Sequence, residues 1–465
     1  MKTALKVKLL GLALLASSSQ VNAADWLSLQ GEQPAVVAPK GVKVPYRSKV
    51  PKLWGFIQVN YKQDLGTVSD FNPISNKNDG INRTPFSLLN PDLQSQSGVN
   101  LFRARLALRG MADNDNLVNY FFMTEFANNG VNNLAGHGNV ATFFSDASIT
   151  LKHVPYAKVR VGKFKYPGSE EGLQAVFVSP YITFTNMTNQ QLLERLVTNV
   201  GTVQTGLAAG GAKTDHYTSS EVTQPIGAFR DTGIQIFDTV DIANDWAVSY
   251  AYMHGNGTGI SNSSSDSQET NYGFLALEQT YGGRGYFTQA LKFYLWGQSG
   301  KRSLLSNDGT TTTRVDTNRK RYGLGMTYYN YGLRFEAEYM KAEGMIYTGA
   351  KDKNPDALQE DWQFQYAVGD ENKADGGYVN LQYEIVPKKF EVFGRYDYLN
   401  RLTNDEKAER DFTTTTLGCS YRFKGPTRLD FNYLIRDIQA PNNANAQTVV
   451  DNIGDRVEVQ FTAAF

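Results

Sequence analysis

The feature that most constrains this chain is a recurrent alternation of apolar and polar side chains in segments of about ten residues. In residues 455–465, for example, Val457, Val459 and Phe461 alternate with Glu458 and Gln460. Because a β-strand directs successive side chains to opposite faces, each such segment is predicted to be a strand with one apolar and one polar face. The predicted strands are 53–63, 101–110, 117–126, 142–152, 157–165, 231–238, 246–253, 271–280, 289–299, 319–328, 332–341, 376–386, 389–399, 413–423, 427–436 and 455–465.

The connections between these strands alternate between long and short. Residues 65–100 separate the first two strands, whereas a turn at 113–116 joins the second to the third. A soluble sandwich has no reason to keep all its long loops on one side, but outer-membrane barrels place short turns in the periplasm and long loops outside. A closed ring also leaves no unpaired strand edge in lipid. We therefore predict an all-β fold, a transmembrane antiparallel β-barrel of about 16 strands with short periplasmic turns and long extracellular loops, over residues 53–465.

The N-terminus has the pattern of a secretory signal peptide. Lys2, Lys6 and Lys8 precede an apolar run at 9–16, and Val21-Asn22-Ala23 forms a small-residue cleavage site. We expect residues 1–23 to be removed during export to the outer membrane; the alternative is an N-terminal anchor. Residues 24–52 are basic and punctuated by proline, and are predicted to form a periplasmic leader, either as a plain linker or as a functional tether.

Charge and motifs exclude several functions. The chain has 46 basic and 46 acidic residues, and removal of 1–23 takes away three lysines and no acid, which argues against nucleic-acid binding. The four histidines are isolated, the single cysteine, Cys419, has no disulfide partner, and no metal-ligand spacing, nucleophile elbow or phosphate-binding loop is present. We expect no catalysis, no cofactor and no metal. The adjacent Glu170 and Glu171 are predicted to be solvated.

The strand 101–110 carries one cationic face. Arg103, Arg105 and Arg109 lie at alternate positions, about 6.6 Å apart per two residues, while Phe102, Ala104, Leu106 and Leu108 are predicted to face lipid. A barrel of about sixteen strands encloses an aqueous channel, so these arginines are predicted to line it. Guanidinium groups suit phosphate and carboxylate oxygens and keep their charge at physiological pH.

Further cations continue this predicted lining. Lys158 and Arg160 alternate in the same way on 157–165, while Lys163 and Lys165 change parity and require a bulge near Gly162. The predicted channel-lining and anion-binding residues are Arg103, Arg105, Arg109, Lys158, Arg160, Lys163, Lys165, Arg334 and Arg395. The competing interpretation is that these bases pair with Glu125, Asp146, Glu336 and Glu338.

The insertion at 166–230 follows the fifth strand. We predict that it folds inward and narrows the pore; the alternative is a surface loop over the mouth.

Several segments resemble the phosphate-selective porin O/P family of Gram-negative bacteria. They are LFRARLALRG at 101–110, DASITLK and KVRVGKFKYP within 146–167, GGYVNLQYEI at 376–385, FGRYDYL at 393–399 and the last strand ending in Phe465. The resemblance implies a sixteen-stranded, usually trimeric barrel, with an arginine ladder at Arg103, Arg105 and Arg109 that leads to a basic constriction. The insertion departs from this pattern, because Arg195, Lys213 and Arg230 are accompanied by Glu170, Glu171, Glu194, Asp215 and Glu221.

The resulting expectation is an outer-membrane porin for passive diffusion of small hydrophilic solutes, with a preference for anions such as phosphate. Its expected partners are the lipid bilayer, lipopolysaccharide, small anionic or polar solutes and two further copies in a homotrimer, with no nucleic acid. Two alternatives remain: a non-selective general porin, and a plugged barrel that acts as a receptor, adhesin or structural protein.

Overall fold

The structure is a computed structural model. It describes residues 51–66, 69–72, 77–83, 97–113, 115, 117–127, 143–194, 216–218, 227–243, 245–259, 268–282, 288–307, 312–350, 364–367, 369–423 and 427–465. The predicted signal peptide 1–23, nearly all of the leader 24–52, and residues 195–215 and 219–226 of the insertion lie outside the described residues.

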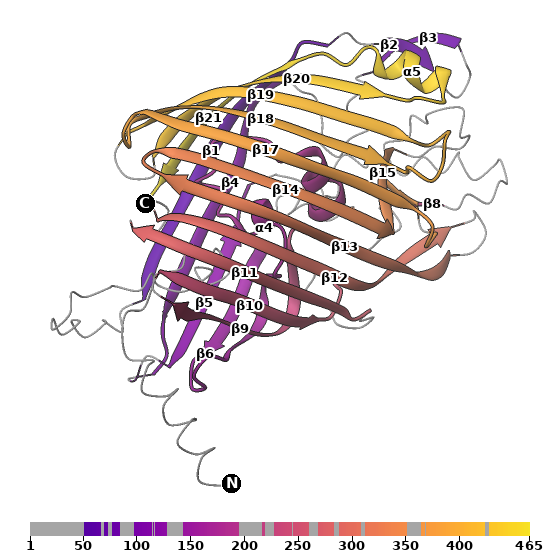
Figure 1. The fold of residues 1–465 in the computed structure, drawn as a ribbon. Coiled ribbons are helices and arrows are strands. Elements are labelled where there is room, and N and C mark those ends of the chain that lie inside the picture. The colour runs from indigo at the N-terminus through magenta and orange to yellow at the C-terminus, as the bar shows by residue number, and fades with distance from the viewer. Residues whose placement is uncertain are drawn as a thin grey trace.

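The described residues form a closed antiparallel barrel of sixteen strands, which confirms the predicted fold class (Figure 1). All sixteen predicted strands are present. Their bounds are β1 (Lys52–Asp64), β4 (Ser97–Met111), β5 (Val118–Glu125), β6 (Phe143–Leu151), β7 (Lys158–Lys165), β9 (Arg230–Ala243), β10 (Trp246–Gly255), β11 (Thr270–Gly282), β12 (Gln289–Asn307), β13 (Thr312–Asn330), β14 (Leu333–Gly344), β17 (Lys373–Val386), β18 (Phe390–Arg401), β19 (Arg410–Arg422), β20 (Arg428–Gln439) and β21 (Arg456–Ala464).

Smaller elements accompany the barrel. Two small sheets are formed by β2 (Ser69–Asn72) with β3 (Lys77–Arg83), and by β15 (Ile346–Ala350), β16 (Phe364–Ala367) and β8 (His216–Thr218). The helical segments are α4 (Glu170–Leu173), the π-helix η1 (Thr188–Leu193) and α5 (Ala444–Val450). None of the helices in the described ranges has the length and apolar character needed to cross a membrane. Both small sheets and α5 lie at the end of the barrel that is opposite to the C-terminus (Figure 1).

The barrel closes between its first and last strands. The two strands pair continuously from Phe56 opposite Ala464 to Asp64 opposite Arg456. Gly55 and Phe465 exchange both backbone N–H to carbonyl hydrogen bonds at 3.0 Å. Because this pairing joins the ends of the chain, no edge of the main sheet is left without a partner.

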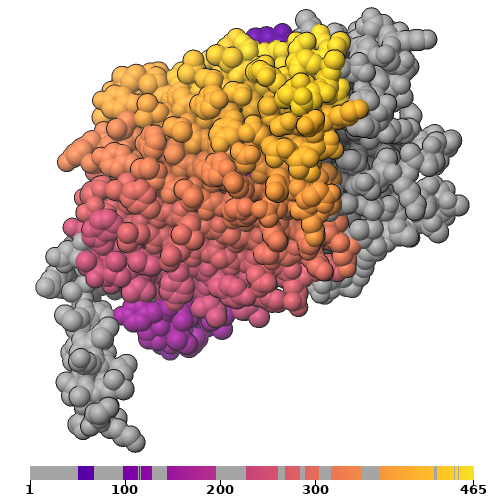
Figure 2. Space-filling model, turned by 45° about the vertical axis from the view of Figure 1, so that its right-hand side comes forward, coloured from indigo at the N-terminus to yellow at the C-terminus, as the bar shows by residue number. Residues whose placement is uncertain are grey.

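The two faces of the wall differ as the alternation predicts. On β1, Ile57 and Tyr61 are exposed on the outside, whereas Gln58 and Asn60 are buried inside. Figure 2 shows the outer surface as one continuous wall along which the later strands follow in chain order. This pattern fits a sheet with lipid outside and a polar lumen, because each lipid-facing residue alternates with one that faces inward.

The local face assignment of Phe102 is wrong. A register shift places Gln58 opposite Arg103 but Val59 opposite Leu101, so that Phe102 is the extra residue of a β-bulge. Leu101 is 50% exposed and Phe102 is 7% exposed. Phe102 therefore does not face lipid, since the bulge reverses the alternation at this point.

The predicted bulge near Gly162 is also wrong. The pairing of β7 with β6 and with β9 has no register shift. Gly162 instead adopts a φ of 126°, and Lys163, Phe164 and Lys165 are all buried after it. A single glycine conformation thus replaces the extra residue that the change of parity suggested.

The predicted polar loop between 299 and 319 is largely a paired hairpin. Strands β12 and β13 pair from Ala290 opposite Tyr329 to Asn307 opposite Thr312. A strand that extends beyond the bilayer needs no apolar face, so its backbone pairing continues where the alternation of side chains ends.

Candidate channel constriction

Residues 166–194, the first part of the insertion, lie inside the barrel and contact widely separated strands of the wall. Ser169 donates to Glu338 of β14 at 3.0 Å, and Lys62 of β1 donates to Thr183 at 3.1 Å. From β20, Arg428 donates to the carbonyl groups of Val178 and Ser179. We call residues 166–194 the lumen segment.

Three carboxylates of the lumen segment form ion pairs with cations of the wall. Glu170 lies 2.6 Å from Lys292 of β12, Glu171 lies 3.1 Å from Arg395 of β18, and Glu194 lies 2.7 Å from Arg319 of β13. The prediction that Glu170 and Glu171 are solvated is therefore wrong, since both are ion-paired and Glu170 is only 4% exposed. Burial without these partners would carry a large desolvation penalty, so the pairs explain how the carboxylates lie inside the barrel.

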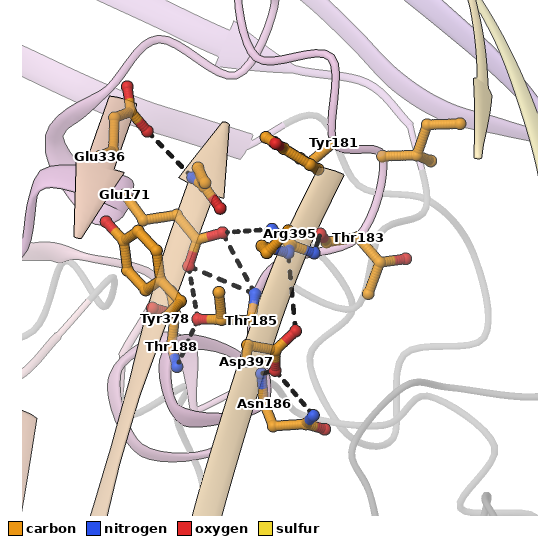
Figure 3. A network of polar contacts seen from close by, with 12 residues as sticks. Glu171, Tyr181, Thr183, Thr185, Asn186, Thr188, Glu336, Tyr378, Arg395 and Asp397 are labelled. Atoms are coloured by element: carbon orange, nitrogen blue, oxygen red, sulfur yellow. Dashed lines mark hydrogen bonds and ion pairs between the residues drawn. The ribbon is translucent and has the colours of Figure 1, made fainter. Parts of the chain in front are cut away.

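Arg395 lies at the centre of a polar network (Figure 3). Its guanidinium contacts Glu171, lies 3.5 Å from Asp397, donates to the carbonyl of Thr183 at 2.6 Å and covers the ring of Tyr181. Burial raises the pKa of Tyr181 above its ordinary value, so this phenol stays neutral. Arg395 is one of the predicted anion-binding residues. In the structure its guanidinium is surrounded by carboxylate, carbonyl and aromatic groups of the protein itself.

A second group of charges lies on the other side of the barrel. In the ring order, β7 is eight strands from β18 and therefore opposite to it. Lys165 lies within electrostatic range of Arg103, Arg105 and Arg230, and Lys163 within range of Asp146 and Arg230. We call this group the basic wall; among the described residues it comprises the bases Arg103, Arg105, Lys163, Lys165 and Arg230 and the acids Glu125 and Asp146.

The contacts within the basic wall fix its side chains. Arg105 Nε lies 2.6 Å from Glu125 Oε2, and Arg230 Nε lies 3.0 Å from Asp146 Oδ2. Lys165 Nζ donates to the backbone carbonyls of Gly172, Leu173 and Gln174. Lys165 thus links the basic wall directly to the lumen segment.

Arg103 has aromatic and amide neighbours. Its Nη1 donates to Gln58 Oε1 at 2.9 Å, and its guanidinium carbon lies 4.2 Å from the ring centre of Phe102 and 5.7 Å from that of Phe184. The bulge at Phe102 therefore places a ring beside the first arginine of the predicted ladder.

Four further predicted residues, Arg109, Lys158, Arg160 and Arg334, have other contacts. Arg109 lies over Trp54, and Arg334 over Tyr329. Lys158 Nζ is 2.9 Å from Asp238, and Arg160 donates to Thr150 at 3.2 Å. These four bases have partners on adjacent strands.

The competing interpretation, in which the bases pair with four named acids, is correct for part of the set. Glu125 does pair with Arg105, but Asp146 pairs with Arg230, a residue predicted to belong to the insertion. Glu336 accepts from Asn380, and Glu338 accepts from Ser169, Trp296 and Tyr378.

Arg230 is the residue of the basic wall that the sequence analysis missed. It is the first residue of β9, is 2% exposed and lies opposite Lys165. The signal in the sequence is its position directly before the predicted strand 231–238, since β9 begins one residue earlier than that strand.

The arrangement supplies a fixed electrostatic field. Arginine keeps its proton at physiological pH, so the charges of Arg103, Arg105 and Arg230 do not depend on a titration. Within the described ranges, no group of three or more His, Cys, Asp or Glu side chains is arranged to hold a metal ion.

A closed sixteen-strand barrel with an apolar outer face, charged inner walls and a segment folded inside it defines the class of outer-membrane channels called porins. A family model described as phosphate-selective porin O and P matches residues 84–465, and the chain belongs to this family. It is therefore a channel protein of the Gram-negative outer membrane.

Solved structures with a similar chain path include the following three. The trimer form of OmpT, an outer membrane protein of Vibrio cholerae, is 13% identical, with a TM-score of 0.49 and coverage of 90% of this chain and 99% of that chain. The anion-selective porin from Comamonas acidovorans is 14% identical, with a TM-score of 0.49 and the same coverage. Salmonella typhi OmpF, in complex with daunomycin, is 11% identical, with a TM-score of 0.49 and coverage of 89% and 97%. No curated protein sequence matches the chain.

Proposed function

We propose that the protein forms a water-filled channel for passive diffusion of small hydrophilic solutes, and that it prefers anions such as phosphate. The observation that carries the proposal is the basic wall, in which five bases accompany two acids among the described residues. Anions pass along the cations of this wall.

The charge of the lumen segment supports this direction of selectivity. Its carboxylates Glu170, Glu171 and Glu194 are paired with cations of β12, β18 and β13. They therefore oppose the field of the basic wall only weakly, because each is neutralised by a close partner. Several weakly holding cations in succession favour passage, since a solute must be able to leave each one.

The reversal potential tests the proposal. Purified protein is inserted into planar bilayers with a tenfold KCl gradient, for which a perfectly anion-selective channel gives about 59 mV of the sign set by chloride. We expect a potential of that sign for the wild type. Added phosphate is expected to lower the chloride conductance, because both anions use the same cations.

Variants connect the selectivity to the basic wall. Arg103→Ala/Arg105→Ala is expected to reduce the chloride to potassium permeability ratio severalfold, whereas Lys320→Ala, which removes an exposed charge from the outer face of β13, leaves it unchanged. Cation preference in the wild type, or an unchanged ratio in the double variant, contradicts the proposal.

The two alternatives give different currents. A plugged barrel that acts as a receptor, adhesin or structural protein carries no steady ohmic current. A non-selective general porin conducts with a reversal potential near zero.

Assembly and export form part of the same proposal. We propose a homotrimer, on the basis of the family resemblance and of the trimer form of OmpT, with the apolar outer face in contact with the bilayer and lipopolysaccharide. Native mass spectrometry of the detergent-extracted protein tests the trimer. N-terminal sequencing tests whether the signal peptide 1–23 is removed.

A further inference from the structure

We propose that Arg395 is a positioning residue that holds the lumen segment in place through the geometry of its guanidinium, and that it is not a binding site for the permeant anion. The proposal rests on the proposed function, in which the lumen segment narrows the channel. According to this proposal, Arg395 of β18 fixes the width of the channel.

The contacts of Arg395 join two parts of the lumen segment that are separate along the chain. Nη1 of Arg395 lies 3.1 Å from Glu171, a residue of α4, while Nη2 donates to the carbonyl of Thr183 at 2.6 Å. The guanidinium carbon lies 4.5 Å from the ring centre of Tyr181. The planar fork of an arginine makes these contacts in different directions at once, so the residue fixes both parts relative to β18.

The two carboxylates beside Arg395 extend the network further into the lumen segment (Figure 3). Asp397 accepts from the backbone N–H of Asn186 at 2.9 Å and from its side-chain amide at 2.8 Å. Glu171 accepts from the backbone N–H and the hydroxyl of Thr185. The anchoring of residues 185 and 186 therefore depends on carboxylates that Arg395 neutralises.

The contacts of Arg395 separate the two roles that a lumen arginine can have. The residue is 3% exposed, and its guanidinium faces Glu171, Asp397, Thr183 and Tyr181. An anion at this place would have to displace two carboxylates and a carbonyl oxygen. The same contacts hold the lumen segment against β18, and we call this positioning role a clamp.

Arg395→Lys distinguishes the two roles, because lysine keeps the charge but loses the planar fork. If Arg395 acts through its charge, the lysine variant behaves like the wild type. If it acts as a clamp, the lysine variant resembles Arg395→Gln. A matched control is Arg422→Lys, at a buried arginine of β19 that is ion-paired with Glu391 of β18 and Glu384 of β17.

Hydrogen–deuterium exchange measures the clamp directly in the full-length folded protein in detergent. Folding of each variant is checked first by its heat-modifiable migration on a gel. In both Arg395→Lys and Arg395→Gln, we expect exchange of the Thr185 and Asn186 amides to accelerate by about tenfold, since local opening becomes easier when their acceptors lose a partner. Arg422→Lys is expected to leave these two amides unchanged. Wild-type exchange in Arg395→Lys overturns the proposal.

Single-channel recording in bilayers gives the second measurement. We expect both Arg395 variants to show larger open-channel fluctuations at an unchanged sign of the reversal potential. If both variants instead show open-channel fluctuations no larger than those of the wild type, together with a lowered chloride preference, Arg395 belongs to the anion-selective part of the channel. That result would overturn the positioning role. A wild type that lacks anion preference contradicts the proposed function alone, because the exchange of Thr185 and Asn186 does not depend on selectivity.

Discussion

Arg105 on β4 and Glu125 on β5 form a buried ion pair in the basic wall, with Nε 2.6 Å from Oε2. The other oxygen of Glu125 accepts backbone N–H groups of Ala104 at 2.8 Å and Ala127 at 3.2 Å. The carboxylate therefore has two effects that can be separated: it orders the wall, and it offsets part of the positive field that the proposed anion path requires.

Glu125→Gln is expected to increase the preference for anions. Glutamine retains one carbonyl oxygen for the backbone N–H groups but removes the negative charge beside Arg105. A unit charge at about 4 Å contributes about 1 kcal/mol in water, so the chloride to potassium permeability ratio should rise by about twofold to fivefold. The reversal potential in a KCl gradient checks this, with Glu343→Gln on the outer face of β14 as control. A fall in the ratio would mean that the order of the wall outweighs its net charge.

The Lys292–Glu170 pair is expected to stabilise the folded protein only as a pair. Lys292 Nζ lies 2.6 Å from Glu170 Oε2, and the two side chains are 2% and 5% exposed. Lys292→Met leaves a buried carboxylate without this partner and is expected to cost about 3 kcal/mol, whereas Lys292→Met/Glu170→Gln should cost much less. Guanidinium unfolding in detergent measures the four states of this double-mutant cycle. Additive losses would show that the two groups act independently.

The fold was predictable because the signal that specifies it is local. Each strand that crosses lipid needs an apolar side chain at every second position, so the alternation is visible in segments such as 455–465 without knowledge of the partner strand. The pairing of Gly55 with Phe465 then follows from the need to close the ring.

The site was less predictable because its contacts are not local. Glu171 and Arg395 are 224 residues apart, and nothing in either sequence neighbourhood indicates the other. Phe102 was misassigned because an apolar ring suits either lipid or the interior, and a bulge leaves no mark in the order of residues. The sequence thus identified most of the cations but did not distinguish those that neutralise the lumen segment from those of the basic wall.

Asp113, in the short turn between β4 and β5, is expected to make stability depend on pH. Its carboxylate accepts the backbone N–H groups of Val118 and Leu117 at about 3.0 Å, and these bonds hold its pKa below the ordinary value of 3.8. Since the pKa is lower in the folded state, the ionised group stabilises the fold above pH 3.8, and the contribution is lost as the pH falls through the lowered pKa.

Asp113→Asn should therefore lower the guanidinium midpoint at pH 7 and have a diminishing effect as the solution is acidified below pH 3.8. Asp115→Asn, at an exposed position of the same turn, is the control. An effect of Asp113→Asn that is equally large at pH 7 and pH 2 would show that the hydrogen-bond geometry matters and the charge does not.

Gly162→Ala is expected to destabilise the barrel at the start of the basic wall. Gly162 has a φ of 126°, which L side chains rarely adopt, and an added Cβ would lie 2.2 Å from the carbonyl oxygen of Ala147. Relief of this contact requires β7 to move away from β6, next to Lys163, so we expect a loss of about 2–3 kcal/mol. Gly273→Ala is the matched control, because an added Cβ there meets nothing within 4 Å. Guanidinium midpoints of both variants, compared with the wild type in the same detergent, give the difference, and equal midpoints would show that β7 adopts another backbone conformation at this position.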